Sequence, residues 1–116
     1  MKPKQITDDL NQLIEILPKT IQAALSSEDN QNELLEIVLD LGRVPEARYS
    51  NKVVEIPNIS ITHKDLLEIV NKLGEFGADN RAGIQRTLHR ISAIRNRQGD
   101  VIGLTCRVGR AVFGTV

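Results

Sequence analysis

The sequence predicts an α+β domain built on a small, mostly antiparallel sheet with flanking helices. Apolar residues recur at helical spacing over residues 10–25 and 62–73, whereas residues 35–39 and 91–107 alternate between the two sides of a strand. Helices and strands are therefore mixed along the chain, which indicates the α+β class. The 116 residues fit one domain and can bury a core without disulfides or a structural metal.

The N-terminal part of the chain is predicted to be helical. Thr7 supplies a helix cap, and the two aspartates after it favour the positive end of a helix dipole. Pro18 separates this first helix from a short second one. The apolar positions of the two helices are Leu10, Leu13, Ile14, Leu17, Ile21, Ala24 and Leu25. A polar loop follows, so we divide the chain into an N-terminal helical segment, 1–33, and an α+β domain, 34–116.

Two strand signals come next along the chain. Residues 35–39 alternate, with Leu35, Ile37 and Leu39 predicted to share the buried face of a strand. Residues 47–56 then predict a short hairpin, because the asparagine of Ser50-Asn51 suits the positive φ of a tight turn. Pro57 ends this hairpin.

The following helix has a clear local start signal. Thr62 and Asp65 form an approximate capping box, with Asp where Glu or Gln is usual. The buried stripe of this helix is predicted to hold Leu66, Leu67, Ile69, Val70 and Leu73. Gly74 or Gly77 ends the helix. Residues 75–86 show no clear period, so we predict a loop there.

Residues 87–97 and 101–108 are the best hairpin candidate, and Gly99 takes the positive φ of the turn between them. One face is predicted to be core and carries Ile91, Ala93, Ile102, Leu104, Cys106 and Val108. The opposite face, which we expect to meet solvent or a ligand, carries Arg90, Ser92, Ile94, Thr105 and Arg107. Arg95 and Arg97 share the parity of the core face but lie near the turn, where long side chains reach water.

Composition excludes several classes of protein. A single cysteine rules out a disulfide framework within the chain and a cysteine zinc site. No apolar run approaches the about 20 residues that a membrane helix needs, and the N-terminal residues do not lead into the apolar segment of a secretory signal. We therefore expect a cytoplasmic protein, or one in the plastid stroma.

No catalytic constellation is predicted within the chain. It contains neither a phosphate loop of the form G-x-x-x-x-G-K-S/T nor a nucleophile elbow of the form G-x-S-x-G. His63 is predicted to be an ordinary first-turn helix residue, and His89 an exposed or half-buried strand residue. Cys106 alternates with apolar neighbours and is predicted to be a small core residue. We expect this chain to hold no catalytic residue, metal or cofactor of its own.

A cluster of arginines is the most informative feature of the sequence. Residues 1–80 hold 8 basic and 14 acidic side chains, whereas residues 81–110 hold 7 basic side chains and one acid, Asp100. All seven bases are arginines: Arg81, Arg86, Arg90, Arg95, Arg97, Arg107 and Arg110. Arginine presents a planar fork that grips phosphate or carboxylate through two hydrogen bonds, whereas a solubilising surface usually includes lysine as well.

Three interpretations of this cluster stay open. It is a solvated hairpin face whose ion pairs contribute little, a phosphate footprint for nucleic acid, or a contact to a nucleotide held by a neighbouring subunit. The chain has three aromatic residues, Tyr49, Phe76 and Phe113, and none lies on the hairpin, which weakens the case for single-stranded nucleic acid.

Three stretches resemble a known group of proteins. Residues 35–49 and the helix start at 61–67 resemble the opening of the N-terminal domain of secretion and pilus-retraction ATPases. Residues 81–97 and 103–114 resemble more closely the cyanobacterial and plastid P-loop ATPases known as a hypothetical chloroplast reading frame, with stage III sporulation protein AA as a more distant relative. The resemblance covers about residues 7–116.

This resemblance implies a PAS-like N-terminal domain of a hexameric ATPase that ends before the phosphate loop. It implies no catalysis by this chain, ATP and Mg²⁺ in the longer protein, and contacts with an ATPase domain and with neighbouring subunits, while nucleic acid stays a possible partner. Arginines of the hairpin then reach the nucleotide of the adjacent subunit. By motif position these are Arg90, Arg95 and Arg107, and the interface or basic patch is Arg81, Arg86, Arg97 and Arg110.

Overall fold

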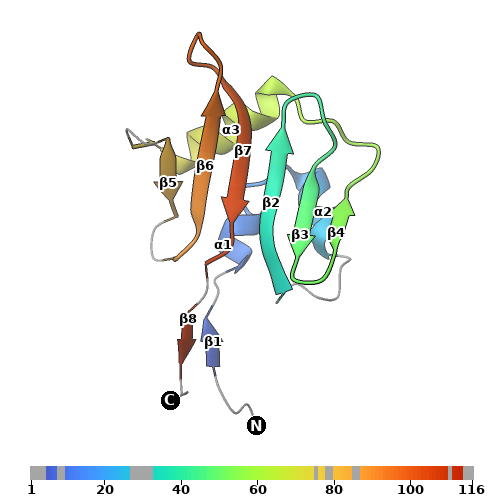
Figure 1. Cartoon of the computed structure of the whole chain (residues 1–116), viewed down its shortest axis with the longest axis vertical. Helices are drawn as coiled ribbons and strands as arrows, with labels where there is room; N and C mark the ends of the chain where they lie inside the picture. Colours follow the sequence, from blue (N-terminus) through green and yellow to red (C-terminus); the bar gives the residue numbers. More distant parts are fainter. Residues whose placement is uncertain are drawn as a thin grey trace.

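The computed structural model describes residues 5–7, 10–26, 33–74, 76–77, 80–84, 87–109 and 111–113. An open six-stranded antiparallel sheet in the order β4-β3-β2-β7-β6-β5 forms the body of the fold, and β1 pairs with β8 in a separate two-stranded ribbon (Figure 1). The strands are β1 Gln5–Thr7, β2 Leu34–Asp40, β3 Glu46–Tyr49, β4 Val53–Glu55, β5 Arg81–Gly83, β6 Arg90–Arg95, β7 Val101–Arg107 and β8 Ala111–Phe113. The predicted α+β class, with a mostly antiparallel sheet and flanking helices, is confirmed.

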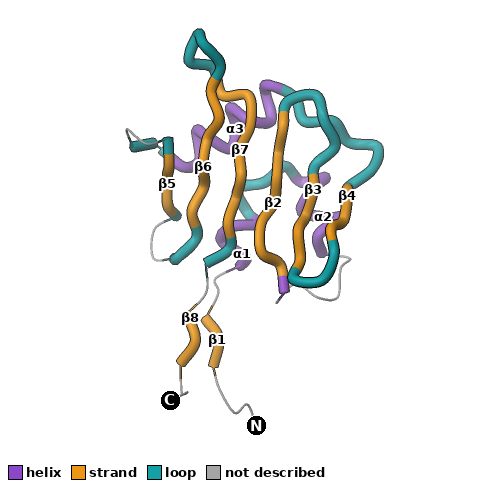
Figure 2. The backbone as a smooth tube through the Cα atoms, in the orientation of Figure 1, coloured by secondary structure: helices purple, strands orange, loops and turns teal. Residues whose placement is uncertain are grey.

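Three helices lie behind the large sheet, so that its other face is left open (Figures 1 and 2). They are α1 Leu10–Ile14, α2 Lys19–Ser26 and α3 His63–Leu73. Their buried side chains, among them Leu13, Ile21 and Leu66, belong to the same hydrophobic core as Ile37, Ile91 and the other inward residues of the sheet. The helices therefore cover one face only, and the polar residues that alternate with the core on each strand point away from them. None of the described helices is long and apolar enough to cross a membrane.

The local signals at α3 are confirmed by its caps. Thr62 Oγ1 accepts a hydrogen bond from the Asp65 backbone N–H at 3.1 Å, and the Asp65 carboxylate accepts from the Thr62 N–H at 2.9 Å. Gly74 ends the helix with a φ of 86°, and its N–H donates to the Val70 carbonyl. Leu67, predicted to lie in the buried stripe, is exposed, because it sits about 100° around the helix from Leu66.

The strand and turn predictions hold in part. The hairpin of β3 and β4 forms around Ser50 as expected, but Asn51 does not take the positive φ predicted for it: among the described non-glycine residues, Asn58 and Asn80 have a positive φ. In β2 a bulge between Leu34 and Glu36 changes the faces on which the first side chains lie. Leu34 is therefore buried and Leu35 is exposed, although Leu35 was predicted to be buried.

The β6–β7 hairpin keeps the predicted faces along most of its length. Ile91, Ala93, Leu104 and Cys106 are buried as predicted. A bulge after Ile94 shifts the register, so that Val101 enters the core where Ile102 was predicted. Val108, also predicted to be core, is partly buried against it.

Two predictions failed where short strands pair. Residues 81–83 were predicted to lie in a loop but form β5 at the edge of the sheet, with Ala82 opposite Ile91. Thr7, predicted to cap the first helix, pairs with Ala111 in the β1–β8 ribbon instead, and α1 begins at Leu10. The partner of Thr7 is far away in the sequence, and β5 is only three residues long, so local patterns reveal neither pairing.

Candidate anion-binding site

The open face of the sheet is organised in rows of side chains that run across the strands. In one row Glu36 of β2 lies beside Arg107 of β7, and Arg107 lies directly opposite Arg90 of β6. In the next row Thr105 of β7 faces Ser92 of β6, and Ser92 faces Arg81 of β5. Antiparallel pairing therefore brings three arginines, from three neighbouring strands, onto one small area.

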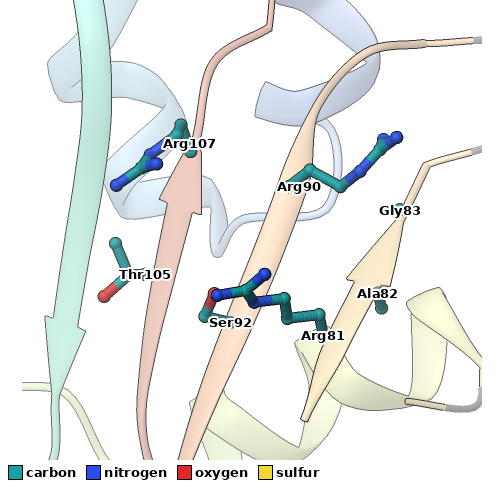
Figure 3. Close-up of a pocket in the computed structure, with 7 residues that line it drawn as sticks. All are labelled: Arg81, Ala82, Gly83, Arg90, Ser92, Thr105 and Arg107. Atoms are coloured by element: carbon teal, nitrogen blue, oxygen red, sulfur yellow. The ribbon is translucent and has the colours of Figure 1, made fainter. Parts of the chain in front are cut away.

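A pocket of about 430 Å³ lies among these side chains (Figure 3). It is lined by Arg81, Ala82, Gly83, Arg90, Ser92, Thr105 and Arg107. Figure 3 shows the Arg107 side chain turned toward β2, the Arg90 side chain turned toward the edge strand β5, and Arg81 reaching toward Ser92. The pocket thus has cationic groups on its sides and two hydroxyl groups on its floor, which is the chemistry of an anion site.

Placing Arg90 directly opposite Arg107 costs stability. Like charges that face each other across two strands repel, by an amount similar to the roughly 0.2–1 kcal/mol that a favourable cross-strand pair contributes. Arg107 keeps 74% of its side-chain surface exposed, so water screens part of this repulsion. The two side chains also turn apart, Arg107 toward β2 and Arg90 toward β5 (Figure 3).

Arg90 and Arg107 of the pocket differ in the interactions that their guanidinium groups make. The Arg90 guanidinium donates from Nη1 to the carbonyl oxygen of His89 at 3.0 Å. Within the described ranges no carboxylate pairs with Arg90. Gly83 makes room for this guanidinium, since a Cβ on Gly83 would lie 3.2 Å from Arg90 Nη1. Arg107 Nη2 lies 3.9 Å from Glu36 Oε1, which is a long and weak ion pair.

The structure brings some of the candidate residues together and separates others. Arg90 and Arg107, both proposed as phosphate contacts, line the pocket, and Arg81 of the predicted basic patch joins them. Arg95, the third proposed phosphate contact, lies elsewhere: its Nε donates to Asn80 Oδ1 and its Nη1 to the Gly99 carbonyl, both at 2.9 Å. These bonds hold Arg95 at the turn end of the hairpin, beyond the bulge.

The remaining arginines of the cluster do not add to the pocket. Arg97 is exposed in the turn between β6 and β7. Arg86 and Arg110 lie outside the described residues. Sequence reasoning placed Ser92 and Thr105 on the open face but did not identify them as parts of a site, and it missed Gly83. The alternation of Ser92 with Arg90, and of Thr105 with Arg107, was the signal that could have found the hydroxyls.

His89 is buried, although the sequence predicts an exposed or half-buried residue. Its Nδ1 accepts a hydrogen bond from the Gly109 N–H at 3.0 Å, and its own N–H donates to Thr87 Oγ1 at 3.2 Å. The neighbouring Leu88 is exposed instead. A buried histidine that receives a backbone hydrogen bond fixes the segment after β7 beside the start of β6, and so it supports the strand end that carries Arg90.

Cys106 and His63, the other reactive side chains that the sequence offers, do not line the pocket. Cys106 is buried, as predicted, and burial raises its thiol pKa to about 12, so it carries no thiolate near neutral pH. His63 is exposed in the first turn of α3, as predicted. No group of three or more metal-ligating side chains occurs among the residues that the structure describes.

Comparison with known proteins finds relatives that match almost the whole chain. It is 54% identical over 111 residues to "Uncharacterized protein ycf45" of Porphyra purpurea, covering 96% of this chain and 20% of that protein. It is 50% identical over 109 residues to "Protein SEEDLING PLASTID DEVELOPMENT 1" of Arabidopsis thaliana, covering 94% of this chain and 16% of that protein. "Uncharacterized protein ycf45" of Cyanidium caldarium is 43% identical over 109 residues, and this chain spans 32% of that protein. No family model matches.

These relatives contradict the assignment to a P-loop ATPase family that the resemblance predicts. Their names are ycf45 and SEEDLING PLASTID DEVELOPMENT 1, and neither name describes an ATPase. Among solved structures, the X-ray structure of the Legionella pneumophila ATPase DotB has a TM-score of 0.45 and 14% identity, covering 78% of this chain and 27% of that one.

Proposed function

We propose that this chain is a non-catalytic domain that binds the phosphate groups of a nucleotide through the arginine pocket on its open sheet face. The observation that carries the proposal is that Arg81, Arg90 and Arg107, from three adjacent strands, line one pocket of about 430 Å³. A guanidinium group forms parallel hydrogen bonds to two phosphate oxygens, and the hydroxyls of Ser92 and Thr105 donate to further oxygens.

The side chains of the pocket suit binding rather than catalysis. Arginines hold and neutralise phosphate, but they do not accept a proton near neutral pH. A serine or threonine needs an adjacent general base to act as a nucleophile, and among the residues that the structure describes neither a carboxylate nor a histidine lines the pocket. We therefore propose that the chain contributes charge to a nucleotide and that any hydrolysis takes place with groups supplied by another protein or domain.

The layout of the open face favours a compact phosphate ligand over nucleic acid. The arginines that line the pocket come from β5, β6 and β7, whereas β2, β3 and β4 carry Glu36, Glu46 and Glu55 on the same face. Arg48 of β3 also lies there, but it is paired with Glu36 and Glu46. A nucleic-acid strand that crossed the sheet would meet these carboxylates. In the described part of the chain no aromatic side chain lines the pocket, so these residues offer no platform on which a base stacks.

We propose further that the nucleotide is bound by a neighbouring subunit. An arginine supplied from a second subunit stabilises the charge that develops in phosphoryl transfer, and such contacts accelerate the reaction by about 10³–10⁵. ATP with Mg²⁺ is then the cofactor of the assembly, which we place in the cytoplasm or the plastid stroma. In that assembly we expect Arg90→Ala to lower turnover, and Arg90→Lys to restore little of it, because a point charge lacks the fork geometry.

We expect the isolated chain to bind phosphate weakly. Hydrogen bonds to charged groups contribute about 1.5–3 kcal/mol each. Three contacts at the lower value give about 4.5 kcal/mol, which corresponds to a dissociation constant in the range of about 1 mM. Tight ATP binding by the chain alone, at micromolar affinity, would mean that it holds a nucleotide site of its own and would contradict the proposal.

Titration with inorganic pyrophosphate by calorimetry at low salt tests the proposed site. We expect saturable binding that Arg90→Ala weakens at least fivefold. Arg97→Ala is the matched control, since it removes the same charge from the exposed turn of the same hairpin. Equal losses from the two variants would show that net charge, and not the pocket, attracts the anion. A single-stranded oligonucleotide that binds more tightly than pyrophosphate would favour the nucleic-acid alternative.

A further inference from the structure

A row of alternating charges runs across the open face of the sheet, from β3 to the arginine pocket. Arg48 of β3, Glu36 of β2 and Arg107 of β7 occupy one cross-strand row, with Glu36 in the middle. Arg48 Nη1 lies 3.1 Å from Glu36 Oε2, and Arg107 Nη2 lies 3.9 Å from Glu36 Oε1. One carboxylate is therefore shared between an arginine outside the pocket and an arginine that lines it.

The geometry shows which of the two arginines Glu36 engages more closely. The contact with Arg48 has hydrogen-bond length, whereas the contact with Arg107 is at the limit of an ion pair. The Glu36 side chain is 19% exposed and the Arg107 side chain 74% exposed, so Glu36 is held in the sheet surface while Arg107 can swing. Figure 3 shows Arg107 turned toward β2, which is the side of Glu36 and away from Arg90.

We propose that Glu36 competes with the phosphate ligand for Arg107, and that Arg48 sets the strength of this competition by occupying Glu36. The proposal rests on the phosphate-binding function proposed above and adds a means of adjusting the affinity of the pocket for phosphate. With Arg48 in place, part of the Glu36 charge is neutralised, and Arg107 is free to turn into the pocket. Without Arg48, Glu36 draws Arg107 away more strongly. Glu36 and Arg48 are thus positioning residues for a site that neither of them lines.

The competition predicts opposite effects from two substitutions at one ion pair. Glu36→Gln keeps the size of the side chain but removes its charge, so pyrophosphate should bind about two- to fivefold more tightly, in the range of an exposed ion pair. Arg48→Ala should weaken binding by a similar factor although Arg48 does not line the pocket. Arg48→Lys keeps the charge beside Glu36 and should retain most of the wild-type affinity.

Calorimetric titration of the full chain with pyrophosphate, as a double-mutant cycle, tests the proposal. In a Glu36→Gln background, the effect of Arg48→Ala should shrink, because the carboxylate through which Arg48 acts is gone. Glu55→Gln is the matched control for charge: it removes a carboxylate from the same face on β4, where Glu55 pairs with Glu46 and is remote from the pocket. Thermal unfolding of each variant verifies that it is folded.

The outcomes separate this inference from the function on which it rests. If the chain binds pyrophosphate through Arg90 but Glu36→Gln and Glu55→Gln raise the affinity equally, this adjustment of the affinity is overturned and the phosphate site stands. An unchanged effect of Arg48→Ala in the Glu36→Gln background overturns it as well. If the wild-type chain shows no saturable binding, the proposed function is wrong, and the proposed role of Glu36 and Arg48 is overturned as well.

Discussion

Replacing Leu104 by alanine tests the assignment of the two sheet faces on which the arginine pocket depends. Leu104 is fully buried in the central strand β7, with Leu39 of β2 and Ala93 of β6 as its register partners. Its truncation removes apolar contacts and leaves a cavity that neighbouring strands cannot close, which costs about 2–5 kcal/mol. Domains of this kind have a free energy of unfolding of about 5–15 kcal/mol, so the loss is a large part of the total.

Urea denaturation followed by circular dichroism measures this loss. The matched control is Ile94→Ala, because Ile94 lies on the neighbouring strand but on the open face, where it is 51% exposed. We expect Ile94→Ala to cost less than about 1 kcal/mol. The reasoning is refuted if the two variants lose equal stability. Leu104 would then not be a core residue, and Thr105 and Arg107 would not share an open face with Arg90.

Three further predictions concern stability. Gly109→Ala should lower the unfolding midpoint strongly, because a Cβ there collides with the Leu88 backbone carbonyl; an unchanged midpoint would contradict this packing. Burial raises the Cys106 pKa from 9.0 to about 12, so the folded state holds its proton more tightly than the unfolded state. Its contribution to stability should therefore be complete below pH 9 and be lost as the pH rises toward 12, and Cys106→Ala should show a smaller decline over that window than the wild type. Thr62→Ala removes the cap of α3 and should cost about 1 kcal/mol, whereas a loss near zero would show that Asp65 caps the helix alone.

Local signals in the sequence were sufficient for much of the fold. The capping box at Thr62 and the positive φ of Gly99 act within a few residues, and both are present in the structure. The faces of the β6–β7 hairpin followed from alternation alone, since a strand has a side-chain period of two. That alternation also put Arg90 and Arg107 on one face, which is why two of the three proposed contacts lie together.

Features that leave no periodic pattern in the sequence were not predicted. A three-residue strand such as β5 is too short to show a period, so the position of Arg81 beside Ser92 became evident only from the sheet. Bulges leave no mark in the sequence alternation either: the shift after Ile94 separates Arg95 from the pocket, although its motif position made it a candidate. The burial of His89 depends on Gly109, 20 residues further along the chain.

A map of amide chemical shifts during titration with pyrophosphate tests the central claim most directly. The account predicts saturable shifts concentrated on β5, β6 and β7, at the residues that line the pocket, and their loss in a variant with Arg90→Ala. Residues of β3, β4 and the three helices should change little, apart from the row that includes Arg48. Shifts that are absent, that fail to saturate, or that survive Arg90→Ala would contradict the claim that this pocket binds phosphate.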